Sequence, residues 1–201
     1  MNDNKQNKKF LLEKFSNAKI LDNKKYLEIQ IDQNEIFDVI QSLRDDSRLQ
    51  YDQLIDLTAI DYPSREKRFD IIYILLSMTL NSRVLVRSSI NENTKIQSII
   101  QIHRSANWYE RECYDLFGIQ FLNHPDLRRI MTDYNFEGHP LRKDFPLTGH
   151  TEVRYDDLEK KVVYEPVKLT QEFRNFDYMS PWEGFENELL GDEKVDEESN
   201  K

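Results

Sequence analysis

The first half of the chain consists of short apolar or alternating runs separated by turn residues, with a few longer segments of helical period. Short alternating or apolar runs predict β-strands, and here they lie at residues 26–31, 54–61, 68–77 and 82–89. Apolar residues at helical spacing predict helices over residues 8–16, 33–45 and, in two pieces, 93–118. We therefore expect an α+β fold: one compact domain with a mixed β-sheet flanked by helices, followed by a long extended C-terminal arm.

The glycines divide the chain into two parts of different character. All five glycines lie at or after Gly118, and the residues beyond it are rich in Pro, Gly, His and Asn, with only short possible strands such as residues 159–166. Four regions are predicted, namely an α/β globular domain over residues 1–118, a loop-rich region packed on it over 119–150, an extended partner-binding arm over 151–185 and an acidic, disordered tail over 186–201.

The second piece of the last predicted helix carries a continuous apolar stripe. Its members follow one another at steps of four, three, four and three residues, and they are Ile102, Ala106, Tyr109, Cys113 and Leu116. Cys113, the only cysteine, is therefore expected to be a small core residue. A nucleophilic thiolate would need partial exposure and a nearby base or cation, which the stripe argues against.

The ends of this helix have capping signals. Asn107 stands three residues before Glu110, the spacing of a capping box, and Gly118 stands where a left-handed C-cap belongs. Glu110 is thus expected to have a structural role. Glu110 and Glu112 are two residues apart, point in different directions around a helix and cannot act together on one substrate atom.

Two interpretations apply to the acidic residues that follow. Glu112 and Asp115 share one helix face at a spacing of three, so mutual repulsion could raise the pKa of one carboxyl and make a general acid. Arg111 precedes Asp115 by four residues and could pair with it instead, as a partly buried ion pair at a contact between domains or between chains. The ion-pair network is the favoured prediction.

Composition narrows the function classes further. The net charge of -9 disfavours nucleic acid as a partner. A single cysteine makes no internal disulfide or iron–sulfur ligand set, and the histidines lack zinc-site spacing. The longest apolar run, residues 71–80, is too short to span a bilayer, and the N-terminal residues resemble neither a secretory signal nor a transit peptide. No glycine-rich phosphate-binding loop is present.

Aromatic residues are unusually frequent in the predicted arm. They follow no helical period, and they are Tyr155, Tyr164, Phe173, Phe176, Tyr178, Trp182 and Phe185. Disordered segments are depleted in aromatics, so docking on a partner is the favoured interpretation for the arm. A solvated tail is the interpretation kept for the acidic residues after Gly191.

The stretch "ERECYDLFGIQFLNHPDLRRIM" closely resembles the signature of the C-type, or 30 kDa, subunit family of respiratory complex I. The resemblance is strong from about Ala106 to Glu183. The sequence departs from the family pattern at Asn135, His150 and Lys168. It implies structural and partner-contact roles, with no catalytic, cofactor or metal site, for Glu110, Arg111, Glu112, Asp115, His124, Arg128, Arg129, Arg142, Tyr164, Phe173, Arg174, Phe176, Tyr178 and Trp182.

The resemblance also implies a function. A member of this family would be a cofactor-free subunit in the peripheral arm of a proton-pumping NADH:quinone oxidoreductase, with FMN and iron–sulfur clusters on other subunits. It would brace the quinone-site (49 kDa, D-type) subunit and neighbouring iron–sulfur subunits on the matrix face of the mitochondrial inner membrane or the cytoplasmic face of the bacterial one. Related ferredoxin-dependent complexes and membrane-bound hydrogenases are the alternative, and a free-standing hydrolase using Glu112 and Asp115 is a further one.

Overall fold

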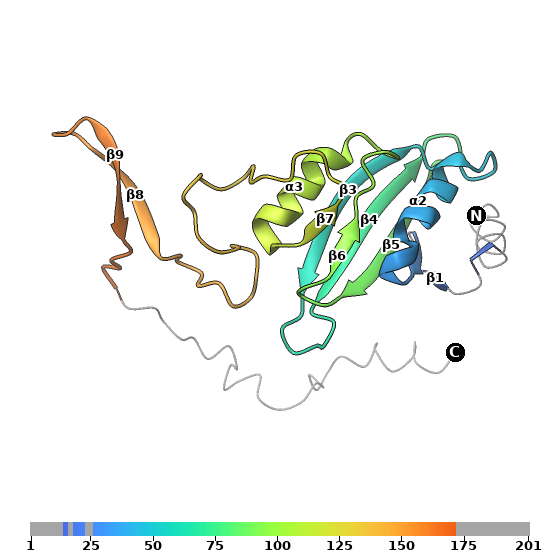
Figure 1. The fold of residues 1–201 in the computed structure, drawn as a ribbon, viewed down its shortest axis with the longest axis horizontal. Helices are drawn as coiled ribbons and strands as arrows, with labels where there is room; N and C mark the ends of the chain where they lie inside the picture. The colour runs from blue at the N-terminus through green and yellow to red at the C-terminus, as the bar shows by residue number, and fades with distance from the viewer. Residues whose placement is uncertain (1–13, 16–17, 23–25, 172–201) are drawn as a thin grey trace, which may run out of the picture. The chain divides into compact units, whose positions relative to one another are not determined.

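The first compact unit of the protein is built on a five-stranded mixed sheet. The computed structural model describes residues 14–15, 18–22 and 26–171, and its described residues form two compact units, one ending at His150 and one beginning at Thr151. The strands are β1 (Lys19–Asp22), β2 (Leu27–Gln30), β3 (Gln53–Asp61), β4 (Phe69–Ser77) and β5 (Ser82–Ile90). Their order in space is β1-β2-β5-β4-β3, and only β2 and β5 pair in parallel (Figure 1). The predicted mixed sheet is confirmed.

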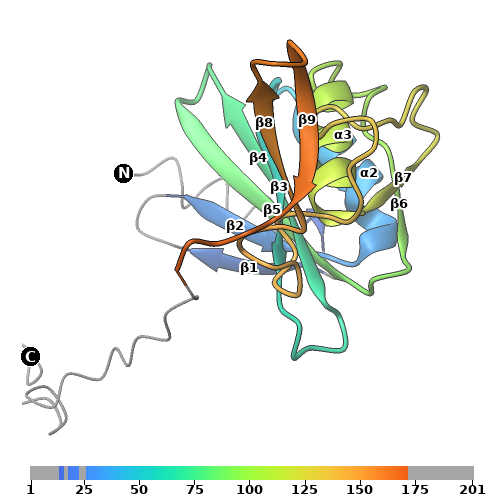
Figure 2. The same cartoon turned by 90° about the vertical axis from the view of Figure 1, so that its left-hand side faces the viewer.

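Two helices cover the same face of this sheet (Figure 2). A short 3-10 turn η1 (Gln33–Glu35) leads into α2 (Ile36–Asp45), and α3 (Ala106–Phe117) follows the sheet strands in sequence. Helix α2 turns a fully apolar stripe toward the sheet, made of Ile36, Val39, Ile40 and Leu43. The core lies between the helices and the sheet, because alternate residues of β4 and β5, such as Tyr73 and Val86, point toward the helices and are buried. The four predicted strands and the helix over residues 33–45 are confirmed.

The prediction of a helix in the first part of residues 93–118 is wrong. Residues Lys95–Gln97 form strand β6, which pairs in parallel with β7 (Gln120–Leu122) on the other side of α3 in sequence. Ile96 and Ile99 are buried. Such a short apolar run fits a buried strand as well as a helix, and periodicity alone cannot separate the two.

Residues 123–150 contain neither helix nor strand. Part of this loop region is packed through aromatic rings: Phe145 lies 5.7 Å from Phe136 and 5.5 Å from His150, centroid to centroid. Other positions of this loop region make polar contacts with α3, described below. Within the described residues, no helix is both long and apolar enough to cross a membrane.

The second unit contains a β-hairpin rather than an uninterrupted extended segment. Strands β8 (Thr151–Asp156) and β9 (Lys161–Pro166) pair antiparallel, so the short strand predicted over residues 159–166 is present. The turn is stabilised by Asp156, whose carboxylate accepts hydrogen bonds from the backbone N–H groups of Leu158 and Glu159. The predicted arm residues Phe173, Arg174, Phe176, Tyr178 and Trp182, the predicted tail over 186–201 and most of the helix predicted over 8–16 lie outside the described residues.

Candidate functional site around helix α3

Helix α3 begins differently from the sequence prediction. Ser105 is the N-cap residue, and its side chain makes no capping hydrogen bond. The capping box of Asn107 and Glu110 is therefore wrong. Instead, Glu110 Oε1 accepts a hydrogen bond from the backbone N–H of Ile99 (2.8 Å), and its Oε2 accepts one from the hydroxyl of Ser98 (2.6 Å). Glu110 thus joins α3 to the segment that follows β6.

Glu110 is a fully buried carboxyl. Burial raises its pKa to about 7, although the hydrogen bonds from Ser98 and Ile99 act in the opposite direction. Among the described residues, the basic side chain that approaches it is His124, whose Nε2 lies 4.0 Å from Glu110 Oε2. Burial without a close lysine or arginine in this part of the chain is what favours the protonated carboxyl.

Asp115 is also fully buried, but it is surrounded by donors. Its Oδ1 accepts hydrogen bonds from Arg129 Nη1 (3.0 Å) and the Thr132 hydroxyl (2.6 Å). Its Oδ2 accepts three backbone N–H groups, those of Ile130 (3.0 Å), Met131 (2.7 Å) and Thr132 (2.9 Å). Burial acts to raise the pKa of Asp115, yet these hydrogen bonds outweigh it and leave the pKa below its usual value.

Arg111 does not pair with Asp115, contrary to the sequence prediction. Its Nε donates to the carbonyl of Arg128 (3.1 Å) and its Nη2 to the carbonyl of Arg129 (3.3 Å), while the cationic partner of Asp115 is Arg129. Arg111 and Asp115 therefore hold the same segment, one by its carbonyls and the other by its N–H groups. We call residues 128–132 with these two side chains the Asp115 junction.

Two histidines fix further loop positions to the backbone of α3. His124 Nε2 lies 3.2 Å from the carbonyl oxygen of Asn107, in the first turn of the helix. His139 Nδ1 lies 2.8 Å from the carbonyl oxygen of Asp115, in the last turn. Each is followed by a proline in the short repeated motifs "HPDLR" and "HPLRK". The loop region thus contacts α3 near both ends.

The C-terminal end of α3 is capped by the same loop. Gly118 has a φ of 79°, the left-handed conformation predicted for this C-cap. Arg142 Nε donates to the carbonyl of Phe117 (2.6 Å), and the N–H of Leu141 donates to the carbonyl of Leu116 (3.1 Å). These contacts satisfy helix carbonyls that have no partner within the helix.

An ion-pair network that the sequence did not reveal connects this end of α3 to the sheet. Arg142 pairs with Glu92 (2.5 Å), and Arg68 donates two hydrogen bonds to Asp61 (2.8 and 2.9 Å) and contacts Asp144 (2.9 Å). The hydrogen bonds from Arg68 lower the pKa of Asp61. The pairs of Arg142 with Glu92 and of Arg68 with Asp144 join residues far apart in sequence, so no local spacing could have predicted them.

These contacts limit what the site can do chemically. Both oxygens of Asp115 are occupied by donors and its pKa is low, so it cannot serve with Glu112 as a general acid. Cys113 is buried, as the stripe predicted, and burial raises the pKa of its thiol well above the usual value. Within the described ranges, no group of three or more His, Cys, Asp or Glu side chains could hold a metal ion. The residues around α3 form structural junctions.

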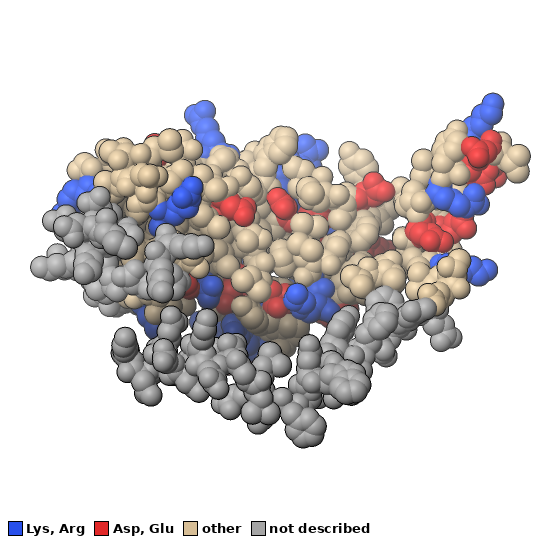
Figure 3. All heavy atoms as spheres, turned by 180° about the vertical axis from the view of Figure 1, so that it is seen from behind, with Lys and Arg blue, Asp and Glu red and all other residues tan. Residues whose placement is uncertain are grey.

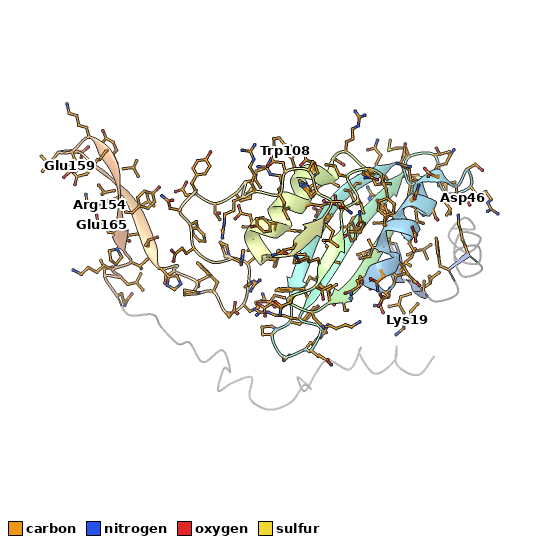
Figure 4. The ribbon with its side chains drawn as sticks, in the orientation of Figure 1. Lys19, Asp46, Trp108, Arg154, Glu159 and Glu165 are labelled. Atoms are coloured by element: carbon orange, nitrogen blue, oxygen red, sulfur yellow. The ribbon has the colours of Figure 1, made fainter. Side chains whose placement is uncertain are left out.

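Outward-facing residues are of a different kind. Trp108 is 68% exposed on the outer surface of α3 (Figure 4), Glu112 is half-buried and Arg128 is exposed, paired with Asp126. In the second unit, exposed apolar residues gather on one face of the hairpin. One hairpin face consists of Thr151, Val153, Tyr155, Val162, Tyr164 and Pro166. We call this the apolar hairpin face.

The opposite face of the hairpin is charged. Arg154 pairs there with Glu165 across the strands and with Asp156 along its own strand, and Arg154 and Glu165 lie beside each other in Figure 4. Figure 3 likewise shows acidic and basic side chains next to one another on the hairpin. On the apolar face, Val153, Tyr155, Val162 and Tyr164 are 54, 58, 53 and 61% exposed. An isolated two-stranded hairpin is marginally stable in water, so an apolar face of this kind is suited to burial against another surface.

An amphipathic hairpin with an exposed apolar face is typical of one class of protein, the subunits that dock onto other chains. The sequence pattern of the family described as "Respiratory-chain NADH dehydrogenase, 30 Kd subunit" matches residues 29–151. The chain belongs to this family. As a member of it, the chain is a subunit of an oxidoreductase complex of the complex I family.

Relatives of high identity support the same assignment. The C-type NADH-quinone oxidoreductase subunit of Parvibaculum lavamentivorans is 61% identical over 158 residues, 79% of either chain. Its counterpart in Ruegeria sp. (strain TM1040) is 57% identical over 168 residues, 84% of either chain. Among solved structures, a chain of the membrane-bound sulfane sulfur reductase, an archaeal respiratory membrane complex, superposes with a TM-score of 0.63 at 23% identity, covering 72% of this chain and 86% of that one. That likeness concerns the fold alone.

Proposed function

We propose that this chain is a cofactor-free brace in the peripheral arm of a proton-pumping NADH:quinone oxidoreductase. It holds the quinone-site (49 kDa, D-type) subunit and neighbouring iron–sulfur subunits in register, while FMN and the iron–sulfur clusters are bound by other subunits. It is peripheral to the membrane and lies on the matrix face of the mitochondrial inner membrane or on the cytoplasmic face of the bacterial one. The relatives named as NADH-quinone oxidoreductase subunits favour NADH chemistry over the ferredoxin-dependent or hydrogenase alternative.

The apolar hairpin face is the observation that carries this proposal. It places four large apolar side chains on one side of two strands and charged residues on the other, and the four remain more than half exposed. Burying such side chains contributes about 25 cal/mol for each Å² of apolar area removed from water. Aromatic residues in the centre of an interface often dominate its energy, and Tyr155 and Tyr164 supply two of them.

The junctions around α3 support the bracing role. The carboxylate of Asp115 and the guanidinium of Arg111 are used to fix residues 128–132, and His139 and Arg142 fix the loop at the end of the helix. Side chains used in this way give the domain a fixed shape. The rate of electron tunnelling falls steeply with the distance between redox centres, so the subunits that hold these centres must be kept in fixed positions. A subunit of fixed shape with an outward docking element can do this.

Two neighbouring valines on β9 provide a matched test of docking through the apolar hairpin face. Val162 lies on the apolar hairpin face, and Val163 lies on the charged face opposite Arg154. Val162→Glu should reduce the amount of assembled complex at least about tenfold, because it places a charge in a buried contact. Val163→Glu should leave assembly near the wild-type level, since Arg154 lies across from it. Native gel electrophoresis of membranes, probed for this subunit and the quinone-site subunit, measures both.

The specific activity of the assembled fraction separates bracing from catalysis. NADH:quinone reductase activity per assembled complex should stay at the wild-type value in both variants. Equal assembly of the two variants would contradict docking through the apolar face. Normal assembly of an inactive complex would contradict a purely structural role.

A further inference from the structure

Two polar side chains are fully buried beside the first half of α3. One is Glu110 of the helix itself, and the other is His124 of the loop. Glu110 accepts hydrogen bonds from Ser98 and Ile99, which follow β6. His124 follows β7, the partner strand of β6. The pair therefore lies where α3 meets the β6–β7 strand pair.

The hydrogen bonds of His124 define its tautomer. Its Nδ1 accepts the backbone N–H of Asp126 (3.1 Å), so the proton of the neutral ring is on Nε2. This Nε2–H has two acceptors within reach, the carbonyl oxygen of Asn107 at 3.2 Å and Glu110 Oε2 at 4.0 Å. It donates to the nearer one, the helix carbonyl.

The other groups that face Glu110 cannot compensate a charge on it. Tyr73, from β4, has a buried hydroxyl without a hydrogen-bond partner among the described residues, and Cys113, one turn further along α3, donates weakly to the carbonyl of Leu57. Burial raises the pKa values of both Tyr73 and Cys113, so both stay neutral. In the described part of the chain, Glu110 forms no ion pair with lysine or arginine, and His124 is the group that can respond to its ionisation.

We propose that Glu110 and His124 form a buried, proton-linked switch between α3 and the segment that begins at His124. When Glu110 is protonated, His124 donates to the carbonyl of Asn107 and holds this segment to the helix. When Glu110 releases its proton to water, the His124 Nε2–H turns to the carboxylate and the Asn107 carbonyl loses its donor. The segment is then attached to α3 mainly through the Asp115 junction. The switch is a property of the chain itself and does not depend on the proposed function.

The sign of the pH dependence follows from the burial of Glu110. Its pKa is raised from 4.5 to about 7, so the folded state holds the proton more tightly than the unfolded state. This contribution to stability is fully present below about pH 4.5 and is lost as the pH rises to about 7. His103 and His139, whose pKa values are lowered by burial, act in the opposite direction, so a difference between variants must be measured.

Urea unfolding of the full chain tests the proposal with two neighbouring carboxyls. Glu110→Gln imitates the protonated form, because its carbonyl can accept from Ile99 and its amide can donate to Ser98. The unfolding constants of wild type and Glu110→Gln should be similar at pH 5. At pH 8 the constant of Glu110→Gln should be lower, on the order of 100-fold. The control Glu112→Gln, on the same helix but half-buried, should differ from wild type by the same factor at both pH values.

Nitrogen-15 NMR of labelled histidine reads the switch directly. The His124 Nε2–H signal should move as this proton changes its acceptor, with a midpoint that follows the ionisation of Glu110 near pH 7 in wild type and in Glu112→Gln, and this component of the shift should be absent in Glu110→Gln. Ser98→Ala removes a hydrogen bond that lowers the pKa of Glu110, so it should raise the midpoint, and it serves as the second variant if Glu110→Gln does not fold. A pH-independent stability difference for Glu110→Gln, or an unchanged midpoint in Ser98→Ala, would overturn the proposal.

Discussion

Glu110 and Asp115 are two fully buried carboxyls on one helix, yet their pKa values are shifted in opposite directions. Glu110 accepts from Ser98 and Ile99, which are neutral donors, and its pKa is raised. Asp115 has three backbone N–H groups, a hydroxyl and an arginine, and its pKa is lowered. The number and charge of the donors, rather than depth alone, decide which carboxyl is ionised.

Asp115→Asn should therefore be strongly destabilising, although the side chain keeps its shape. The amide leaves Arg129 without its counter-charge and turns donors toward the N–H groups of residues 130–132. Removing one partner of a buried pair costs about 3–5 kcal/mol. We expect a loss of this size in the free energy of unfolding at pH 7, measured in urea, with Glu112→Gln as a control that costs under about 1 kcal/mol. A loss below about 1 kcal/mol in Asp115→Asn would show the junction to be weak.

The sequence predicted which residues around α3 matter better than it predicted their partners. Spacing placed Arg111 and Asp115 on one helix face, which is correct, but a spacing of four cannot tell whether a tertiary partner replaces the local one. Here Arg129 does so, because the chain returns alongside the helix. The echo of "HPDLR" and "HPLRK" was visible in the sequence, and both motifs place a histidine on a carbonyl of α3. The interpretation of these His-Pro motifs as turns did not predict the contacts of the two histidines with α3.

At the scale of elements, α3 depends on the loop that closes its C-terminal end. A Cβ on Gly118 would lie 2.5 Å from Arg142 Nη2 and 2.7 Å from His139 Nε2. Strands β2, β3, β4 and β5 were predicted because their alternating or apolar runs are a local signal, whereas the four-residue strand β1 was not predicted. Strands β6 and β7 were not, because each has three residues and becomes a strand only by pairing with the other.

Gly118→Ala tests this closure. The left-handed conformation alone costs a non-glycine residue about 1–2 kcal/mol, and the displaced Arg142 would also release the carbonyl of Phe117. We expect a loss of more than about 2 kcal/mol in thermal or urea unfolding. Gly149→Ala, also at a positive φ of 70°, is the control and should cost only the conformational part. Equal losses in the two variants would indicate that the loop contributes nothing to capping α3.

At the scale of the whole molecule, the two units differ in whether they need a partner to bury their apolar residues. Residues 18–150 include the core between the sheet and the helices, whereas the hairpin has one apolar face and, among the described residues, two strands whose outer edges are unpaired. Such edges and faces favour self-association when no partner covers them.

A chain ending at His150 should therefore fold alone and stay monomeric. Its free energy of unfolding should lie within about 1 kcal/mol of the value for the same unit in the full chain, since the core is retained. The isolated full chain should associate reversibly as its concentration rises. Sedimentation velocity and circular dichroism measure the two properties. A shortened chain that fails to unfold cooperatively would show that the second unit is needed for the first.

The parallel pairing of β2 with β5 has a consequence for the order in which the sheet can be built. Leu27 lies opposite Val84, so β1 and β2 leave the ribosome well before the strand beside which they belong. Strands β3, β4 and β5, by contrast, follow one another in sequence and pair in that order, and each can join the growing meander as it is synthesised. Strands β1 and β2 are therefore synthesised first, but they can join the sheet only after β5 has been made.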